Sequence, residues 1–256
     1  MYRDYSAAQW RNYLKLPTDY MVDGVLVFGS NESYAYKLMD QALERTNVCY
    51  SERRLKGEYL QPVMEVRIDD KTLWFIVAYG GAQLSEFLHL ACSFGSRANI
   101  LLGNCGGLKK GVEAYDLIIP TYSYATESSA TTYQPDVDNQ FASDSALSNA
   151  LESALKPAQT VHRDKTTTCQ AMFGESTQMV QTWANDGYAA VEMEAATVFA
   201  VSSYFKVPAA AVLKVIDNLA KSETIVENGY QPTEKSHADI LDEMFDAALE
   251  QLIRIS

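Results

Sequence analysis

The sequence predicts an α/β fold: a single domain over residues 1–256, with a mixed, mainly parallel central sheet flanked by helices. Three observations support this prediction. Short apolar runs typical of buried strands alternate with longer segments whose apolar residues recur at the helical period. The 256 residues suit one large domain, and 47% hydrophobic with 21% charged residues is an ordinary globular composition. No internal repeat, linker or low-complexity segment divides the chain.

The elements of the first half follow from apolar runs and turn residues. The run at 24–30 is typical of a buried strand that ends in a tight turn. We expect a helix at 31–42, with Asn31 as its N-cap and Glu32 in its first turn. Residues 123–142 indicate a long polar loop. The remaining expected elements are strands at 63–68, 73–78, 98–102 and 116–120 and a helix at 85–94.

The second half continues the alternation. Ser143 is the expected N-cap of a helix at 143–155, and an apolar strand at 209–217 follows Pro208 and ends in Asp217. A strand is also expected at 159–168 and a helix at 177–184. The last helix, 236–254, gathers its apolar residues on one face: Ile240, Leu241, Met244, Phe245, Ala248, Leu249, Leu252 and Ile253.

Composition limits the classes of partner. A net charge of -12 argues against nucleic acid and anionic membranes as main partners. No apolar run approaches membrane-spanning length, and the N-terminus lacks the apolar core of a signal peptide. Four widely spaced cysteines favour reduced thiols in a cytoplasmic protein, and with three distant histidines they make a metal site unexpected.

The segment Val191-Glu192-Met193-Glu194-Ala195 places two acids around a thioether, directly before an apolar run. Buried acids are costly without partners, but a carboxylate can accept hydrogen bonds from two vicinal hydroxyls, and Met packs well on a sugar face. The segment is therefore a candidate sugar-binding floor. By itself it is more typical of a helix start with acids in the first turn.

Glycines follow several expected strands, at Phe28-Gly29-Ser30, Tyr79-Gly80-Gly81 and the run 103–107. Ligands of α/β sheets bind beyond the carboxyl ends of strands, where glycine lets the backbone approach them closely. Each glycine alone indicates only a tight turn. Together with an acid at a fourth strand end, Asp217, they favour a site. Asp217 is as consistent with an N-cap as with a buried proton donor.

Other candidates have simpler explanations. Phe173 could stack on a base, but most such aromatics lie in a core. Arg53 and Arg54 could bind an anion or form a solvated charged pair. Cys105 could act as a nucleophile, yet no histidine is near it in the sequence, so an inert buried thiol is favoured.

In combination, these motifs resemble the nucleoside phosphorylase and nucleosidase superfamily, which includes purine nucleoside phosphorylase, uridine phosphorylase, methylthioadenosine nucleosidase and AMP nucleosidase. Residues 191–195 match its V-E-M-E-A segment at every position. The runs 103–108, 115–120 and 216–219, the last with Glu223 beyond it, are similar to its G-x-C-G-G-L, G-D-x-V-x-P and S-D-N-L motifs. The loop 127–135 keeps only Glu127, Tyr133 and Pro135 of its counterpart. The resemblance covers nearly the whole chain.

The resemblance implies roles for particular residues. Glu194 would hold the ribose 2′ and 3′ hydroxyls, Met193 would pack on the sugar, and Asp217 would protonate a purine in an oxocarbenium-like transition state. No metal or cofactor is implied, and a homo-oligomer is. The implied substrate-binding residues are Glu192, Met193, Glu194, Phe173, Met172, Cys105, Gly106, Asn104 and Gly81. The implied phosphate-binding residues are Gly29, Asn104 and Arg54.

The sequence departs from the family where phosphate would bind. The two family arginines are replaced by Ser33 and Leu101, the phosphate-binding Ser or Thr by Asn104, and the loop His by Thr132. Two lost guanidiniums remove strong charge-assisted contacts. Arg53 or Arg54 could compensate across a subunit interface. The resemblance favours phosphorolysis of a nucleoside, most simply a purine nucleoside. The departures keep hydrolysis as a close alternative, and an inactive nucleoside-binding module as another.

Overall fold

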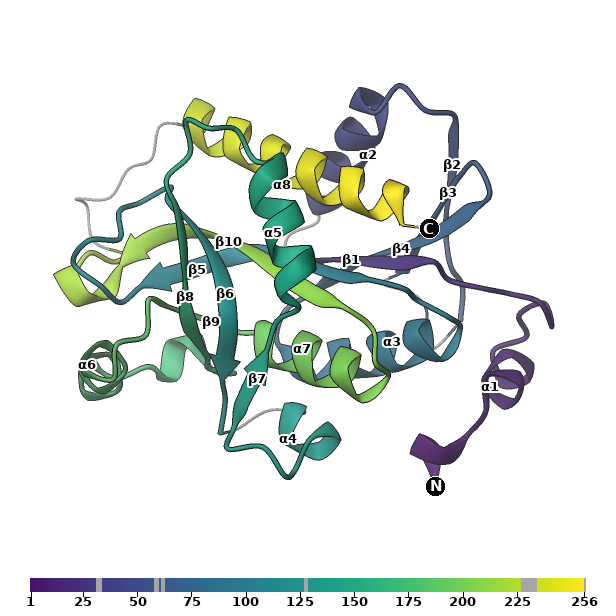
Figure 1. The fold of residues 1–256 in the computed structure, drawn as a ribbon, viewed down its shortest axis with the longest axis horizontal. Helices are drawn as coiled ribbons and strands as arrows, with labels where there is room; N and C mark the ends of the chain where they lie inside the picture. The colour runs from purple at the N-terminus through teal and green to yellow at the C-terminus, as the bar shows by residue number, and fades with distance from the viewer. Residues whose placement is uncertain (31–33, 58–59, 61–62, 127–128, 227–233, 256) are drawn as a thin grey trace.

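The structure is a computed structural model that describes residues 1–30, 34–57, 60, 63–126, 129–226 and 234–255, with only the backbone described at 234–237 (Figure 1). Four residues used in the sequence analysis, Asn31, Glu32, Ser33 and Glu127, lie outside these ranges. The N-cap at Asn31, the acid in the first turn and the arginine replacement at Ser33 therefore remain predictions.

The strands are β1 (Gly24–Gly29), β2 (Tyr50–Arg54), β3 (Val63–Ile68), β4 (Lys71–Ala78), β5 (Asn99–Gly107), β6 (Leu117–Tyr124), β7 (Gln140–Ala142), β8 (Val161–Thr168), β9 (Ala190–Glu192) and β10 (Ala209–Asn218). The α-helices are α1 (Ala7–Tyr13), α2 (Tyr34–Arg45), α3 (Gly81–Ser93), α4 (Ala130–Tyr133), α5 (Ser145–Ala154), α6 (Thr177–Asn185), α7 (Ala195–Tyr204) and α8 (Glu234–Arg254). Three 3₁₀ turns are η1 (Tyr2–Asp4), η2 (Met172–Gly174) and η3 (Leu219–Lys221).

The described strands form one sheet in the order β10-β6-β8-β9-β5-β1-β4-β3-β2, with β7 beside β6. Because β10 also pairs with β5, the strands β5, β10, β6, β8 and β9 close into a barrel-like ring. Parallel pairings join β1 to β4 and β5, β5 to β10, and β8 to β6 and β9. Antiparallel pairings join β3 to β2 and β4, β6 to β7 and β10, and β5 to β9. The expected mixed sheet is present, but parallel pairing does not prevail in it.

Helices cover both faces of the sheet (Figure 1). Alternate residues of β1 point to opposite faces, so that Val25 and Val27 belong to one apolar core and Leu26 and Phe28 to the other. The first core lies under α3 and α7, and the second lies under α2, α5 and α8. Residues 195–202 of α7 are all buried, as expected for a predominantly apolar helix, and only Ser203 and Tyr204 at its end are exposed.

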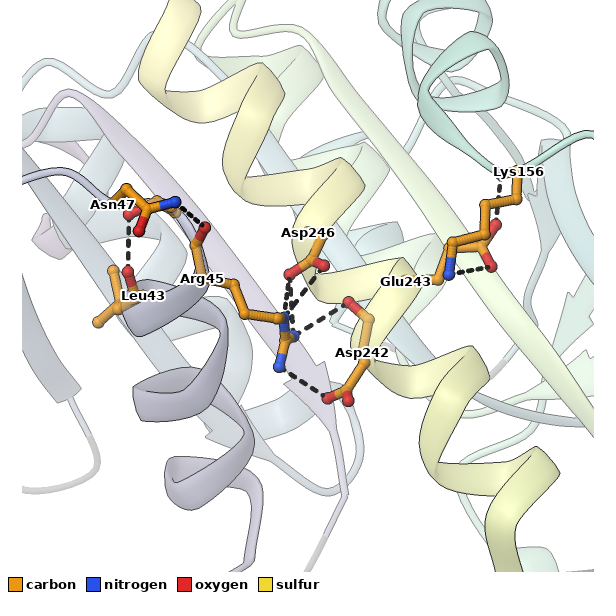
Figure 2. A network of polar contacts seen from close by, with 8 residues as sticks. Leu43, Arg45, Asn47, Lys156, Asp242, Glu243 and Asp246 are labelled. Carbon is orange, nitrogen blue, oxygen red and sulfur yellow. Dashed lines mark hydrogen bonds and ion pairs between the residues drawn. The ribbon is translucent and has the colours of Figure 1, made fainter.

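Polar side chains tie the second helical layer together (Figure 2). Arg45, in the last turn of α2, pairs with Asp242 of α8 at 3.1 Å and with Asp246 at 2.8 Å. Glu243 points to the other side of α8, where its buried carboxylate accepts hydrogen bonds from the Lys156 backbone and, at 3.2 Å, from the Gln159 side chain. Helix α8 is thus joined to the end of α2 and to the segment after α5.

Several expectations about element ends were wrong. Asp144, not Ser143, caps α5: its carboxylate accepts the Leu147 N–H at 2.8 Å, while the Ser143 hydroxyl donates to the Pro120 carbonyl. The segment 123–142 is not one polar loop, because it contains the end of β6, α4 and β7. The two acids of the segment 191–195 do not lie in the first turn of a helix: Glu192 is the last residue of β9, and α7 begins at Ala195.

Candidate active site

The strand ends singled out from the sequence meet at one edge of the sheet. Gly29 at the end of β1 lies opposite Gly103 of β5. Further along β5, Gly106 lies between Val191 of β9 and Asp217 of β10. The pairing of β5 with three neighbouring strands therefore places the acidic segment, the glycine turn and Asp217 around one position.

Glu192 has a structural role at this edge. Its buried carboxylate accepts hydrogen bonds from the Ser123 and Thr168 hydroxyls and from the backbone N–H groups of Glu194 and Ala195, at 2.7 and 2.6 Å. Burial raises the pKa of Glu192, and these four donors, which stabilise the ionised form, oppose that rise. Glu192 therefore fixes the turn that carries its neighbours, and its oxygens are occupied by protein donors.

Glu194 is held differently. One carboxylate oxygen accepts the Gly80 N–H at 2.6 Å, at the N-terminus of α3. The other oxygen lies against Gly29, where an added Cβ would come within 2.7 Å of it. Burial, and then the charge of Glu192, raise the pKa of Glu194 to about 8. The glycine at position 29 thus leaves room for a carboxyl group that reaches the end of β1.

Gln170 joins this group and was missed by the sequence analysis. Its side chain accepts the Gly81 N–H at 2.8 Å and donates to the Met193 carbonyl at 2.9 Å. It therefore ties the N-terminus of α3 to the segment between the two glutamates. A glutamine just after a predicted strand carries no signal in the sequence, because both of its partners are distant along the chain.

Asp217 is 6% exposed and lies beside a bulge of β10, opposite Gly106. Its carboxylate accepts the Ile225 N–H at 3.3 Å. Burial, reinforced by Glu223, raises the pKa of Asp217 to about 6. The capping role that could have explained Asp217 belongs to Asn218, whose side chain accepts the Lys221 N–H at the start of η3. The geometry is therefore that of a buried acid that can hold a proton near neutral pH.

Glu175, directly after η2, is a second acid near Asp217 that the sequence analysis did not single out. Burial, and then the charge of Asp217, raise its pKa to about 7. Met172 and Phe173 precede it in η2, and the Phe173 side chain is 94% exposed. Phe173 is thus not a core aromatic, and its exposed ring is available to stack on a ligand.

Three other candidates lie in different surroundings. Arg53 pairs with the buried Glu65 at 2.8 Å, and the Arg54 guanidinium lies 3.1 Å from the centre of the Tyr36 ring. Their strand, β2, is separated from β1 by β3 and β4, so within one chain the structure does not bring Arg54 to Gly29. Cys105 is buried, and burial raises the pKa of its thiol well above the ordinary value, as expected for an inert thiol.

No group of three or more His, Cys, Asp or Glu side chains in the described ranges is placed to hold a metal ion. Nor does any helix in the described part of the chain combine the length and apolar character needed to cross a membrane.

Comparison with known proteins agrees with this geometry. Residues 78–254 match the model of a family described as the phosphorylase superfamily. The chain belongs to the phosphorylase superfamily. The match includes Gly81, Gly106, Glu194 and Asp217, and it excludes Gly29 and Arg54.

Relatives of this superfamily member are nucleoside-processing enzymes by name. The chain is 26% identical over 160 residues to a DeoD-type purine nucleoside phosphorylase of Bacillus cereus, covering 62% of this chain and 67% of the relative. The same identity over the same length relates it to the corresponding enzyme of Bacillus thuringiensis. It is 29% identical over 124 residues to a guanosine phosphorylase of Halorubrum lacusprofundi, covering 46% of this chain and 48% of the relative. The alignments thus span about half to two thirds of these relatives.

Proposed function

We propose that the protein cleaves the N-glycosidic bond of a purine nucleoside by phosphorolysis. The observation that carries this proposal is the pair of buried acids, Glu194 and Asp217, at one edge of the sheet, with Gly29 and Gly106 leaving space beside their carboxyl groups. The names of the relatives support both the purine and the phosphate. The localisation to the cytoplasm and the homo-oligomer expected from the sequence remain proposals alongside it.

In the proposed mechanism, the sugar is held first. The ribose hydroxyls donate hydrogen bonds to Glu194, while Met193 packs on the sugar. Hydroxyl donors favour the ionised carboxyl and so lower the pKa of Glu194 from its value of about 8 in the free protein. The Gly80 N–H keeps one carboxyl oxygen in place before the substrate arrives, which reduces the entropic cost of orienting the sugar.

Asp217 then makes the base a better leaving group. Its protonated carboxyl donates to N7 of the purine as the C1′–N9 bond breaks, so the base leaves as a neutral molecule. A phosphate oxygen forms the new bond to C1′, and the products are free purine and ribose 1-phosphate. Phe173 or Met172 covers the base, and the backbone around Cys105 and Gly106 lines the nucleoside. Proton transfer of this kind contributes about 10²–10⁴ in rate.

Hydrolysis is the second candidate, and one observation favours it. Leu101 of β5, at the position of a family arginine, is fully buried in the apolar core beneath α3 and α7. This position therefore offers no guanidinium to a phosphate. Arg54 lies on β2 and could reach a phosphate only across a subunit contact. Water would then replace phosphate as the acceptor at C1′.

Product analysis with and without phosphate separates the candidates. Purified protein is incubated with inosine, guanosine, adenosine, methylthioadenosine and AMP, and free base and sugar phosphate are quantified by chromatography. We expect base release to require phosphate and to match sugar phosphate mole for mole. Equal base release without phosphate would establish the hydrolase, and no base from any substrate would favour the binding module.

The variant Asp217→Asn tests the assignment of the acid. The amide keeps the shape but cannot deliver a carboxylic proton, so we expect kcat to fall by about 10²–10⁴. Because the pKa of Asp217 is raised to about 6 and the bound sugar keeps Glu194 ionised, wild-type kcat should fall as pH rises above about 6. The residual activity of the variant should lack this decline. If Asp217→Asn kept wild-type rates, or if its residual activity also declined above about pH 6, Asp217 would be excluded as the acid.

A further inference from the structure

Residues 1–13 form a separate segment at the margin of the molecule, made of η1 and α1 (Figure 1). None of these residues is buried. A cleft of about 570 Å³ is lined both by this segment, at Tyr5 and Gln9, and by Glu86 of α3 and Thr132 of α4. The segment therefore does not pack closely on these helices along its whole length. A segment with few buried contacts can open at a low cost in free energy, and the mechanism above assigns it no role.

Arg3, in η1, joins this segment to the ends of two helices. Its guanidinium donates a hydrogen bond at 3.2 Å to the carbonyl of Tyr133, the last residue of α4. It also lies 3.9 Å from the centre of the ring of Tyr204, the last residue of α7, which is a cation–π contact. Because the Tyr133 and Tyr204 rings are 5.8 Å apart, one arginine holds the end of α4 against the end of α7.

A second contact joins the segment to α3. The Trp10 ring of α1 packs edge-on against the ring of His89 in α3, with 6.1 Å between the ring centres. His89 in turn shares a hydrogen bond of 3.1 Å between its Nδ1 atom and the Tyr133 hydroxyl. Burial, and then the charge of Arg3, lower the pKa of His89, so its ring is neutral at pH 7. The segment therefore meets α4 both directly, through Arg3, and indirectly, through Trp10 and His89.

The other end of α4 lies beside the candidate active site. The hydroxyl of Ser129, the residue before α4, donates to the carbonyl of Gly81, the first residue of α3, at 3.5 Å. Gly80, one residue earlier, provides the N–H that holds Glu194 at 2.6 Å. The position of α4 is thus linked to the donor that orients the proposed sugar-binding carboxyl group, and a displacement of α4 would remove a support from the start of α3.

We propose that residues 1–13 act as a strap over α4, and that Arg3 is a positioning residue for nucleoside binding. This inference rests on the proposed cleavage of a nucleoside. With the strap closed, α4 stays against the start of α3, and the Gly80 N–H remains directed at Glu194 when the sugar arrives. Arg3 is exposed, and an exposed cation–π contact is weak, so the strap opens easily. A nucleoside that binds better to the closed form shifts the strap towards closure.

The test is steady-state kinetics of Arg3→Met, which keeps much of the side-chain length and removes the charge and the hydrogen-bond donors. We expect KM for the nucleoside to rise about fivefold, as for the loss of one exposed cation–π contact, with KM for phosphate within about twofold. A variant that was only less stable would lose kcat and keep both KM values. Arg3→Lys, which keeps the charge above Tyr204, should recover part of the nucleoside affinity.

Two further variants complete the kinetic test. Tyr204→Leu removes the ring beneath Arg3 without changing the strap, and it should raise KM for the nucleoside in the same way. Arg254→Met is the matched control, because it removes a guanidinium from a side chain that is 71% exposed and lies outside the strap. This control should leave both constants unchanged.

Limited proteolysis follows the strap directly and needs neither phosphate nor turnover. Tryptic cleavage after Arg11, within α1, requires the strap to open, so it should be faster in Arg3→Met than in the wild type. By linkage, inosine should slow this cleavage in Asp217→Asn, which consumes it slowly, and the protection should be smaller when Arg3→Met is added.

The outcomes separate the two proposals. If base release does not depend on phosphate, or if no base is released, the proposed phosphorolysis fails, and protection by inosine still tests the strap. Folded Arg3→Met with unchanged KM for the nucleoside and unchanged protection by inosine would overturn the inference.

Discussion

At the residue scale, Glu192 and Glu194 lie two positions apart but their carboxyl groups meet different partners. Glu192 accepts from two hydroxyls and two backbone N–H groups, whereas the backbone donors that act on Glu194 are the N–H groups of Gly80 and Met193. A neutral amide replaces the Glu194 carboxyl group easily, because its one oxygen is enough to accept the Gly80 N–H. It replaces the Glu192 carboxyl group less well, because its NH₂ would face either the two N–H groups, which cannot accept, or the Ser123 and Thr168 hydroxyls, which would lose the acceptor they donate to.

Matched glutamine variants measure this difference. The pKa of Glu194 is raised to about 8, so the folded state binds its proton more tightly than the unfolded state does. Wild-type stability should therefore fall as pH rises from about 4.5 to about 8, by at most about 5 kcal/mol from this group. Glu194→Gln removes that fall and should be more stable than wild type at pH 8, although it loses the proposed sugar contact.

Glu192→Gln should instead destabilise the protein by about 1–3 kcal/mol at pH 8, because a buried donor is left unsatisfied. Chemical denaturation of both variants and the wild type at pH 5 and pH 8 provides the measurement. If the stability of Glu194→Gln relative to wild type did not increase between these pH values, the raised pKa of Glu194 would be wrong.

At the element scale, the position of α3 controls the site. Its first N–H groups hold Glu194 and Gln170, and its close approach to α7 depends on Gly81. A Cβ at position 81 would lie 2.2 Å from the Thr197 hydroxyl oxygen of α7, too close without a shift of one helix. The glycine that the sequence analysis associated with ligand approach thus also sets the packing of two helices.

Gly81→Ala should therefore destabilise the protein by about 1–3 kcal/mol, as expected for overpacking, and should reduce kcat/KM by moving Gly80 away from Glu194. Gly111→Ala is the matched control, because no described atom lies within 4 Å of the Cβ that it would add. The control should change the free energy of unfolding by less than about 1 kcal/mol. Equal effects of the two substitutions would refute this packing argument.

At the scale of the whole molecule, α8 is joined to α2 and to the segment after α5 through its acidic side chains (Figure 2). The Arg45 side chain is 34% exposed, so its pairs with Asp242 and Asp246 are partly screened by solvent. We expect Arg45→Met to lower stability by about 1 kcal/mol or less, and 1 M NaCl to reduce this difference.

Arg254→Met is the control for that substitution, because its pair with Glu250 is more exposed and lies within α8 alone. It should change the free energy of unfolding by less than Arg45→Met does. Urea denaturation at low and high salt compares the variants. A larger loss at high salt than at low salt would contradict an electrostatic link between α2 and α8.

The sequence by itself determined the alternation of strands and helices, since burial on both faces requires runs such as 24–30 and 209–217 to be apolar. The combined motifs and their resemblance to the family also singled out Glu194 and Asp217, although alone the first is more typical of a helix start and the second fits an N-cap equally well. Local competition between caps was harder to predict: Ser143 and Asp144 are both good capping residues, and only the path of the backbone selected Asp144.

Tertiary structure decided what depends on pairing between distant strands. Gly106 and Asp217 become neighbours only through the register of β5 with β10. Gln170 and Glu175 likewise acquire their partners from α3 and β10. Strand register joins residues more than a hundred positions apart, and no local pattern records it. The sequence therefore proposed the acids of the candidate site, and the fold added the residues around them.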